Sequence, residues 1–222
     1  MKRVLIFGGH GPASVISQAI IHANNLGFKE YKFAGFINDA GAGNVIDGHP
    51  IIGRLNETPR LIEEGYYFIY TIYKIGGQGD RIRWFQDLNI PNDRLAIFVH
   101  PQAYVAPNSK LAPGCVVMPG AIVSGNTTVG KCSLIMMGAS IGHDNIIGDH
   151  NFLTANSCLG SWIQTGKGVW VGLNSTVRGK VSLGDYSAIG VGAVVTKSVG
   201  ENELWVGNPA KFHKMVTDEI KL

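Results

Sequence analysis

The sequence predicts an α/β N-terminal domain, then an all-β left-handed parallel β-helix, and finally a short C-terminal helical tail. Three observations support this fold class. The first half alternates apolar runs, glycine turns and helical segments, and the second half places an aliphatic residue at every sixth position. The composition, with 30 glycines and only 16% charged residues, is typical of turn-rich β structure and argues against a helical bundle. We place the domain boundaries at residues 1–95, 96–200 and 201–222.

Charge, cysteine content and hydropathy narrow the classes of function. The net charge is only +3 and neither half of the chain is a basic arm, so we expect no nucleic-acid partner. The three cysteines show no CxxC spacing, which favours reduced thiols in the cytoplasm. The apolar run at the N-terminus is too short for a signal peptide, and no stretch is long and apolar enough to suggest a membrane span. We therefore expect a cytoplasmic protein without a membrane partner.

The α/β domain begins with a strand, a glycine turn and a helix. Residues 4–7 are a short apolar run typical of a buried parallel strand, and Pro12 suits the first turn of a helix. Backbone N–H groups at such a turn attract phosphate, so we expect it to approach a nucleotide. The turn consists of Gly8, Gly9, His10 and Gly11. It only approximates a dinucleotide-binding signature, and glycines that merely permit a tight turn remain an alternative.

Two more strands and a helix complete the first half. We expect the strands at residues 31–39 and 66–73 and the helix at residues 79–88. This alternation predicts a small parallel sheet with its ligand crevice at the carboxyl ends of the strands. The second strand ends in Asn38 and Asp39, which we expect on the ribose or base of the nucleotide. A nicotinamide oxidoreductase would also fit this half, but it would leave the second half unexplained.

The second half is a six-residue repeat. Sixteen of the seventeen positions from Val99 to Val195, in steps of six, are Val, Leu or Ile, and Thr165 is the exception. The residue four positions after each of them is mostly small. This period predicts a triangular parallel β-helix with one six-residue unit on each side and three such units in each coil. The aliphatic residue points inward, and the small residue lies where the chain turns a corner.

The repeat, the stretch "GHDNIIGD", the tail "WVGNPAK" and the nucleotide-binding first half resemble the hexapeptide-repeat acyltransferases. The resemblance is strongest to the sugar-nucleotide and sialic-acid acetyltransferases, including the bacillosamine-type N-acetyltransferases. It implies transfer of an acetyl group from acetyl-CoA to the amine of a nucleotide-linked amino sugar. It also implies a homotrimer, with active sites between subunits and no metal. The outward apolar residues Trp162, Ile163 and Trp170 agree with such an assembly.

His143 and Asp144 are the candidate catalytic residues. His143 lies two positions after the inward Ile141, so its side chain should face outward. An imidazole can act as the general base of an amine attack, and a neighbouring carboxylate can orient the ring and stabilise the imidazolium. Two simpler interpretations stay open, because an outward histidine can be a surface residue and Asp144 can stabilise a turn.

The coenzyme site follows from the resemblance and from the three-unit coil. Ser161 should lie one coil beyond His143, and the resemblance assigns the acyl carbonyl to the N–H of Ser161 or Gly160. Outward side chains that stack one coil apart could line the groove for the pantetheine arm, and the tail could bring lysines to the phosphates of coenzyme A. The candidate contacts are therefore Phe152, Gly160, Ser161, Leu173, Val191 and Lys211. Phe152 occupies a position where many relatives have a second histidine, and it can equally be a packing residue. We expect Asp149 and His150 to be solvated turn residues.

Other functions remain as alternatives. A zinc site needs at least three protein ligands, and of the histidines in this half His100 lies more than two coils from His143 and His150. A non-enzymatic scaffold or nucleotide sensor would not bind coenzyme A. Within the enzymes, O-acetylation of a sialic-acid-like sugar or transfer of a different acyl group is the closest alternative. The sequence leaves the sugar and its nucleotide open.

Overall fold

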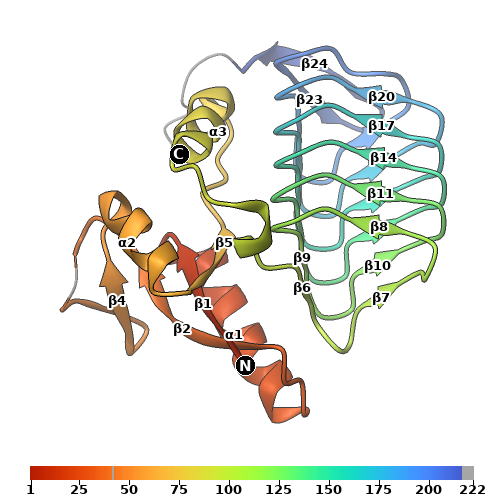
Figure 1. Cartoon of the computed structure of the whole chain (residues 1–222). Coiled ribbons are helices and arrows are strands. Elements are labelled where there is room, and N and C mark those ends of the chain that lie inside the picture. The colour runs from red at the N-terminus through yellow and green to blue at the C-terminus, as the bar shows by residue number, and fades with distance from the viewer. Residues whose placement is uncertain (42, 217–222) are drawn as a thin grey trace.

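The computed structural model describes residues 1–41 and 43–216, which form an α/β part and a parallel β-helix that lie side by side (Figure 1). The α/β part has a five-stranded sheet in the order β3-β4-β2-β1-β5, parallel except for β3. Its strands are β1 (Lys2–Phe7), β2 (Tyr31–Ile37), β3 (Val45–Ile46), β4 (His49–Gly53) and β5 (Tyr67–Tyr70). Its helices are α1 (Pro12–Asn25), α2 (Thr58–Glu63) and α3 (Gln78–Asp87), with 3₁₀ turns at Leu55–Glu57 and Asn92–Arg94.

The helices and strands of this part follow from local sequence. The strand β1 is buried over its last four residues, as its apolar run predicts. Pro12 occupies the first turn of α1, after Gly11 with a φ of 83°, a conformation that glycine adopts easily. The helix α1 buries one face against the sheet, with Ala13, Ile16, Ala19, Ile20 and Ala23. The third strand is shorter than the sequence predicts, ending at Tyr70.

The β-helix consists of two-residue strands that recur every six residues without a slip, as the sequence predicts. The strands are β6 (Phe98–Val99), β7 (Tyr104–Val105), β8 (Lys110–Leu111), β9 (Val116–Val117), β10 (Ile122–Val123), β11 (Thr128–Val129), β12 (Leu134–Ile135), β13 (Ser140–Ile141), β14 (Ile146–Ile147), β15 (Phe152–Leu153), β16 (Cys158–Leu159), β17 (Gln164–Thr165), β18 (Trp170–Val171), β19 (Thr176–Val177), β20 (Ser182–Leu183), β21 (Ala188–Ile189) and β22 (Val194–Val195). Every third strand pairs in parallel with the one before it in that series, so each coil stacks on the previous one.

Three sheets form the sides of the prism, and we name each after its first strand. The β6 sheet has eight strands, the β7 sheet six and the β8 sheet five. The second residue of each short strand points inward, and these residues form one continuous core. Thr165, the exception in the repeat, accepts a hydrogen bond from the N–H of Gly148 at 2.9 Å, so its hydroxyl oxygen is satisfied inside the prism. The stacked parallel sheets agree with the left-handed β-helix that the sequence predicts.

The tail differs from the sequence-based expectation. Residues 203–215 form a β-hairpin of β23 (Glu203–Gly207) and β24 (Ala210–Met215) instead of a helix. The strand β23 pairs in parallel with β21 and thereby extends the β6 sheet, and Leu204 is buried there. The predicted helical tail is therefore wrong for these residues, because the open end of the sheet offers backbone partners that a helix cannot use. Residues 217–222 of that prediction lie outside the described part.

The α/β part covers the outer face of the β6 sheet. Phe98, Val116, Leu134 and Phe152 of that sheet share one buried cluster with Ile16 and Ile20 of α1. At the same contact, Nδ1 of His22 lies 3.1 Å from Nε2 of the fully buried His100. Within residues 1–41 and 43–216, the β7 and β8 sheets are thus the two sides of the prism that the α/β part leaves uncovered. Across the described residues, no helix is both long and apolar enough to cross a membrane.

Candidate active site

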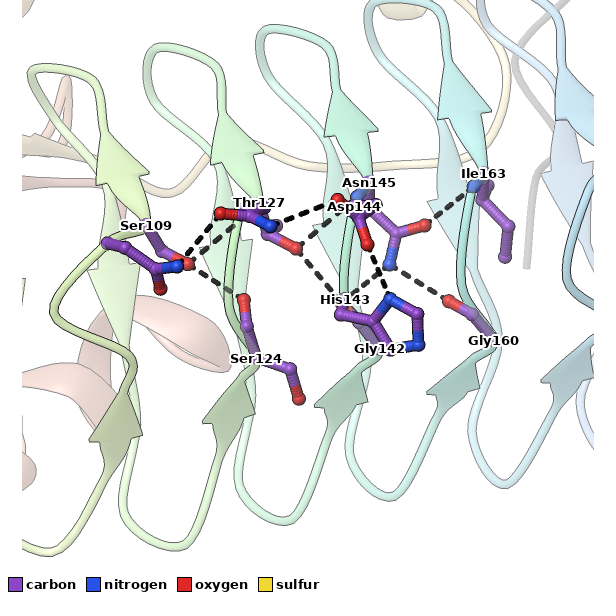
Figure 2. A network of polar contacts seen from close by, with 11 residues as sticks. Ser109, Ser124, Thr127, Gly142, His143, Asp144, Asn145, Gly160 and Ile163 are labelled. Atoms are coloured by element: carbon purple, nitrogen blue, oxygen red, sulfur yellow. Dashed lines mark hydrogen bonds and ion pairs between the residues drawn. The ribbon is translucent and has the colours of Figure 1, made fainter.

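His143 lies at the corner between the β7 and β8 sheets, in the turn that joins β13 to β14. Its side chain is 50% exposed, as the outward position predicts. In a triangular prism this corner is the one opposite the β6 sheet, so it points away from the α/β part of the same chain. Figure 2 shows the ring at the outer edge of the turn, beside the carboxylate of Asp144.

The contact between the two predicted catalytic residues is direct. Nδ1 of His143 lies 2.6 Å from Oδ2 of Asp144. The hydrogen bond from His143, together with a weaker one from Asn126, lowers the pKa of Asp144 below its usual value, so the carboxylate is ionised at neutral pH. An ionised carboxylate can only accept, so in the neutral ring the proton is on Nδ1. Nε2 of His143 is then the basic nitrogen.

A tryptophan from the next coil packs beside this ring. Trp162 meets His143 edge to face, with ring centroids 4.6 Å apart, and Nζ of Lys180 lies 5.4 Å from the centroid of the Trp162 ring. Trp162 itself is 53% exposed. The three side chains therefore occupy successive positions along one outer corner of the prism. Ile163, which the sequence suggested as an outward residue, is fully buried because it takes the inward corner position of the repeat.

Asn145 fixes the spacing between the coil of His143 and the next coil. Its Nδ2 donates to the carbonyl oxygens of Gly142, at 2.7 Å, and Gly160, at 2.9 Å. Its Oδ1 accepts from the N–H of Ile163 at 2.6 Å (Figure 2). Gly142 permits the close approach, since a Cβ there would lie 2.6 Å from the oxygen of Gly160. The backbone around His143 is thus held at a defined distance from the backbone around Ser161.

The two candidate donors for an acyl carbonyl differ in availability. The N–H of Trp162 donates to the carbonyl oxygen of His143, which confirms that Ser161 follows His143 in the same column. The N–H of Gly160 already donates to Val177 at 2.9 Å within the coil ladder. In the part of the chain that the structure describes, the N–H of Ser161 has no acceptor. Ser161 is therefore the donor that the geometry leaves for a ligand.

The remaining coenzyme candidates lie on three different surfaces. Leu173 and Val191 are exposed at the corner between the β6 and β7 sheets, where they stack one coil apart. Lys211 is exposed on β24. Phe152, in contrast, is 5% exposed and lies between Tyr73 and Trp170, at centroid distances of 4.8 and 4.6 Å. Phe152 packs the α/β part against the β6 sheet, so almost none of its side chain is open to the predicted coenzyme contact.

The nucleotide candidates gather at the carboxyl ends of β1 and β2. Nδ2 of Asn38 donates to the carbonyl oxygen of Gly8 at 3.1 Å, so the second strand supports the glycine turn. Oδ1 of Asp39 accepts from the N–H of Leu55 at 3.2 Å. Both side chains thus stabilise local backbone. His10 is largely exposed, with Nδ1 3.7 Å from Asp47, and it is the side chain of the turn most open to a ligand.

His150 is not the solvated turn residue that the sequence suggested. It is 6% exposed and meets the rings of Tyr70 and Phe85 at 5.1 and 5.9 Å. Burial lowers its pKa to about 4. Its corner, between the β8 and β6 sheets, is covered by β5 and α3. The repeat defines which residues point outward, but it does not define which corner the α/β part covers.

Two residues of this site escaped the sequence-based reasoning. Asn145 takes the place of the usual small corner residue, and this break in the repeat was a usable signal. Asn126 lies one coil before Asp144. The same step of three six-residue units that placed Ser161 one coil beyond His143 would therefore have identified Asn126. Among the described residues, no three His, Cys, Asp or Glu side chains group as a metal site.

Comparisons with known proteins give the following likenesses. No protein-family model matches the chain. Over 89 residues it is 33% identical to the acyl-[acyl-carrier-protein]–UDP-N-acetylglucosamine O-acyltransferase of Pseudomonas paraeruginosa. That match covers 40% of this chain and 34% of the relative, so the chain spans about a third of the length of the curated relatives it matches.

Similarity to solved structures extends over almost the whole chain. One is a mutant of perosamine N-acetyltransferase from Caulobacter crescentus in complex with CoA and GDP-perosamine, with a TM-score of 0.82, 24% identity and coverage of 96% of this chain and 98% of that one. Another is the acetyltransferase domain of PglB from Neisseria gonorrhoeae, with a TM-score of 0.82, 21% identity and coverage of 96% and 100%. The α/β part and the β-helix thus occur together in both.

Proposed function

We propose that this chain, which has the hexapeptide-repeat fold of the sugar N-acetyltransferases, moves an acetyl group from acetyl-CoA to the amine of a nucleotide-linked amino sugar. The observation that carries the proposal is the contact of Nδ1 of His143 with Asp144, one coil from the unpaired N–H of Ser161. The structural neighbour that binds CoA and GDP-perosamine has the same two-part architecture. A candidate base and a candidate donor to the acyl carbonyl therefore lie on one edge of the prism.

The proposed reaction is a direct attack without an acyl-enzyme. The neutral amine attacks the thioester carbonyl while Nε2 of His143 takes one of its protons. The N–H of Ser161 binds the oxygen of the tetrahedral intermediate. The intermediate then collapses, the carbon–sulfur bond breaks, and the proton on His143 passes to the departing thiolate of coenzyme A. Asp144 stabilises the imidazolium that exists between these two transfers.

A homotrimer would complete this site. The β7 and β8 sheets, which flank His143 and are free in one chain, carry the exposed apolar residues Tyr104, Ile122 and Ile146. Exposed apolar residues on both free sides favour subunit contacts there. The nucleotide turn of the same chain lies beyond the β6 sheet, so an amino sugar would reach His143 from the α/β part of a neighbour. Light scattering that showed a stable monomer at micromolar concentration would contradict this arrangement.

The two ligands would occupy different parts of the molecule. Gly8, Gly9, His10 and Gly11, at the start of α1, would meet the phosphates of the nucleotide, next to Asn38 and Asp39. Leu173 and Val191 would border the pantetheine arm, and Lys211 would approach the coenzyme phosphates. A thermal-shift series with coenzyme A thioesters and UDP-, dTDP- and GDP-sugars would identify both ligands, because a ligand that binds only the native state raises the Tm.

The decisive experiment replaces the base. His143→Asn should lower kcat by ~10²–10⁴-fold, with little change in binding of either substrate, since the ring acts mainly in the transition state. Asp144→Asn should lower kcat less. Asp149→Asn is the matched control, since Asp149 is a corner carboxylate whose Oδ1 only accepts the N–H of Lys131. Full activity of His143→Asn would end the assignment.

O-acylation is the second candidate. The curated relative that matches 89 residues is an O-acyltransferase that takes its acyl group from an acyl carrier protein. A hydroxyl attack would use the same base and the same N–H donor, so the site geometry fits both. Paired assays, with an amino sugar and its hydroxyl analogue and with acetyl and longer acyl donors, would separate the two reactions by their kcat/KM values.

A further inference from the structure

A line of side chains leads along the outer corner of the prism to His143. Nδ2 of Asn108 donates to Oδ1 of Asn126 at 2.8 Å, and Nδ2 of Asn126 donates to Oδ1 of Asp144 at 3.2 Å. The other carboxylate oxygen of Asp144 faces Nδ1 of His143 at 2.6 Å. The amide groups of Asn108 and Asn126 therefore each donate to the next side chain in the direction of His143. Asn126 also accepts a hydrogen bond from Asn108, one coil before it.

The backbone of this corner explains how the side chains stack. Asn126 and Asp144 have φ values of 57° and 56°, in the left-handed region. Asn and Asp tolerate that region better than most residues, because their short polar side chains can form local hydrogen bonds. Since the two positions are one coil apart, the same conformation puts their side chains directly above one another.

We infer that Asn126 is a positioning residue for the general base, acting through the carboxylate of Asp144. The inference rests on the proposed function. Asp144 is a surface side chain, and with one contact alone its carboxylate could rotate freely in solvent. The amide of Asn126 holds Oδ1, so that Oδ2 stays directed at Nδ1 of His143. The ring is thereby fixed in the orientation and protonation state that leave Nε2 free for the substrate.

The charges around the ring define what a change at Asn126 would do. Asp144 is the carboxylate in contact with His143, and Lys180 lies on the far side of Trp162. Asn126→Asp would replace the donor by a second carboxylate beside Asp144. The added negative charge would stabilise the imidazolium and raise the pH at which the base becomes active. Lys180 is the same in every variant, so it does not affect the comparison.

Two substitutions in the full chain separate positioning from general stability. Asn126→Gly keeps a residue that accepts positive φ and removes the side chain that donates to Asp144. We expect kcat to fall by ~3–10-fold, the range for the loss of one exposed hydrogen bond of ordinary strength, with KM values for both substrates within about twofold. For Asn126→Asp we expect the pH midpoint of kcat to rise by roughly half a unit or more.

The matched control is Asn202→Gly. Asn202 has a φ of 57° and lies several coils beyond His143. Among the described residues, the hydrogen bond of its side chain goes to Glu201. This variant should keep the wild-type kcat and pH midpoint. Wild-type Tm values for both Asn202→Gly and Asn126→Gly would show that each of the two corners folds normally.

A double-mutant cycle gives the sharpest test. If Asn126 acts through Asp144, then Asn126→Gly should have no further effect on kcat in an Asp144→Asn background. An additive effect, or a wild-type kcat and pH midpoint in Asn126→Gly, would overturn the inference. If His143→Asn is fully active, the proposed function itself fails. If His143→Asn is inactive while Asn126→Gly behaves as wild type, only the role of Asn126 is wrong.

Discussion

At the scale of single residues, His143 and His150 show that the same type of side chain takes different roles in different environments. Both lie at corners of the prism in consecutive turns. His143 is half exposed and contacts a carboxylate, whereas His150 is enclosed by Tyr70 and Phe85. The first arrangement favours proton transfer. The second is a packing contact, with a pKa that burial lowers to about 4.

The buried histidine should make folding stability depend on pH. An unfolded histidine has a pKa near 6.5, so below that pH the unfolded chain binds a proton that folded His150 binds only near pH 4. Stability should therefore fall as the pH drops from about 6.5 toward 4, by on the order of 2 kcal/mol at pH 5. His150→Asn, which suits the φ of 55°, should weaken this dependence. Urea unfolding at pH 7.5 and 5 measures the loss of stability between the two pH values. An equal loss in the wild type and in His150→Asn would refute the prediction.

At the scale of one element, the coil is defined by backbone packing between successive turns. The carbonyl oxygen of Gly160 lies so close to Gly142 that a Cβ on Gly142 would be 2.6 Å away. Asn145 bonds both glycine carbonyls and closes this contact. The distance from His143 to Ser161 is thus set by the backbone of the repeat.

Gly142→Ala should therefore damage both stability and activity. Two of the three nearest obstructing atoms are the backbone carbon and oxygen of Gly160, and the third is Oγ of Ser161. The hydroxyl can rotate away, but the backbone atoms can move only if the coils separate, at a cost of ~1–3 kcal/mol. We expect a lower urea midpoint and a lower kcat, because Ser161 moves away from the base. Gly192→Asn is a suitable stability control, since Gly192 has a φ of 66° and no atom within 4 Å of an added Cβ. A wild-type urea midpoint in Gly142→Ala would show that the coils tolerate the extra atom.

At the scale of the whole molecule, the α/β part and the β-helix share buried surface. Phe98, Val116, Leu134 and Phe152 point out of the β6 sheet and into a cluster that includes the first helix. The predicted boundary at residues 95 and 96 therefore separates two topologies but cuts through one apolar cluster. The same contact leaves the β7 and β8 sheets as the free sides of the prism.

The β-helix alone should consequently expose an apolar side. A chain of residues 95–222 should bind a hydrophobic dye such as ANS and elute as aggregates in gel filtration, whereas the full chain should do neither. Replacing Val116, Leu134 and Phe152 together by Thr in the shortened chain should reduce dye binding. A shortened chain that is monodisperse and does not bind dye would mean that this cluster contributes little to holding the two parts together.

The sequence alone was sufficient for the coil register, because in a repeat the spacing of buried aliphatic residues is a local property. It also predicted the outward position of His143 and the stacking of Ser161, which both follow from counting along the repeat. Asp144 was a candidate partner of His143 from the sequence, and its alternative, a turn-stabilising residue, stayed open there. The strand–turn–helix pattern of the first half followed equally from local apolar runs and Pro12.

Only the tertiary structure decided which outward residues are exposed. A six-residue period distinguishes inside from outside, but all three outer sides of a prism look alike in the sequence. Docking of the α/β part on the β6 sheet buried Phe152 and His150 and left His143 free. The tail became a hairpin for a similar reason, since the open sheet end offered hydrogen-bond partners that no local pattern in residues 203–215 indicates. These outcomes depend on contacts between segments far apart in the chain, and such contacts leave no periodic signal.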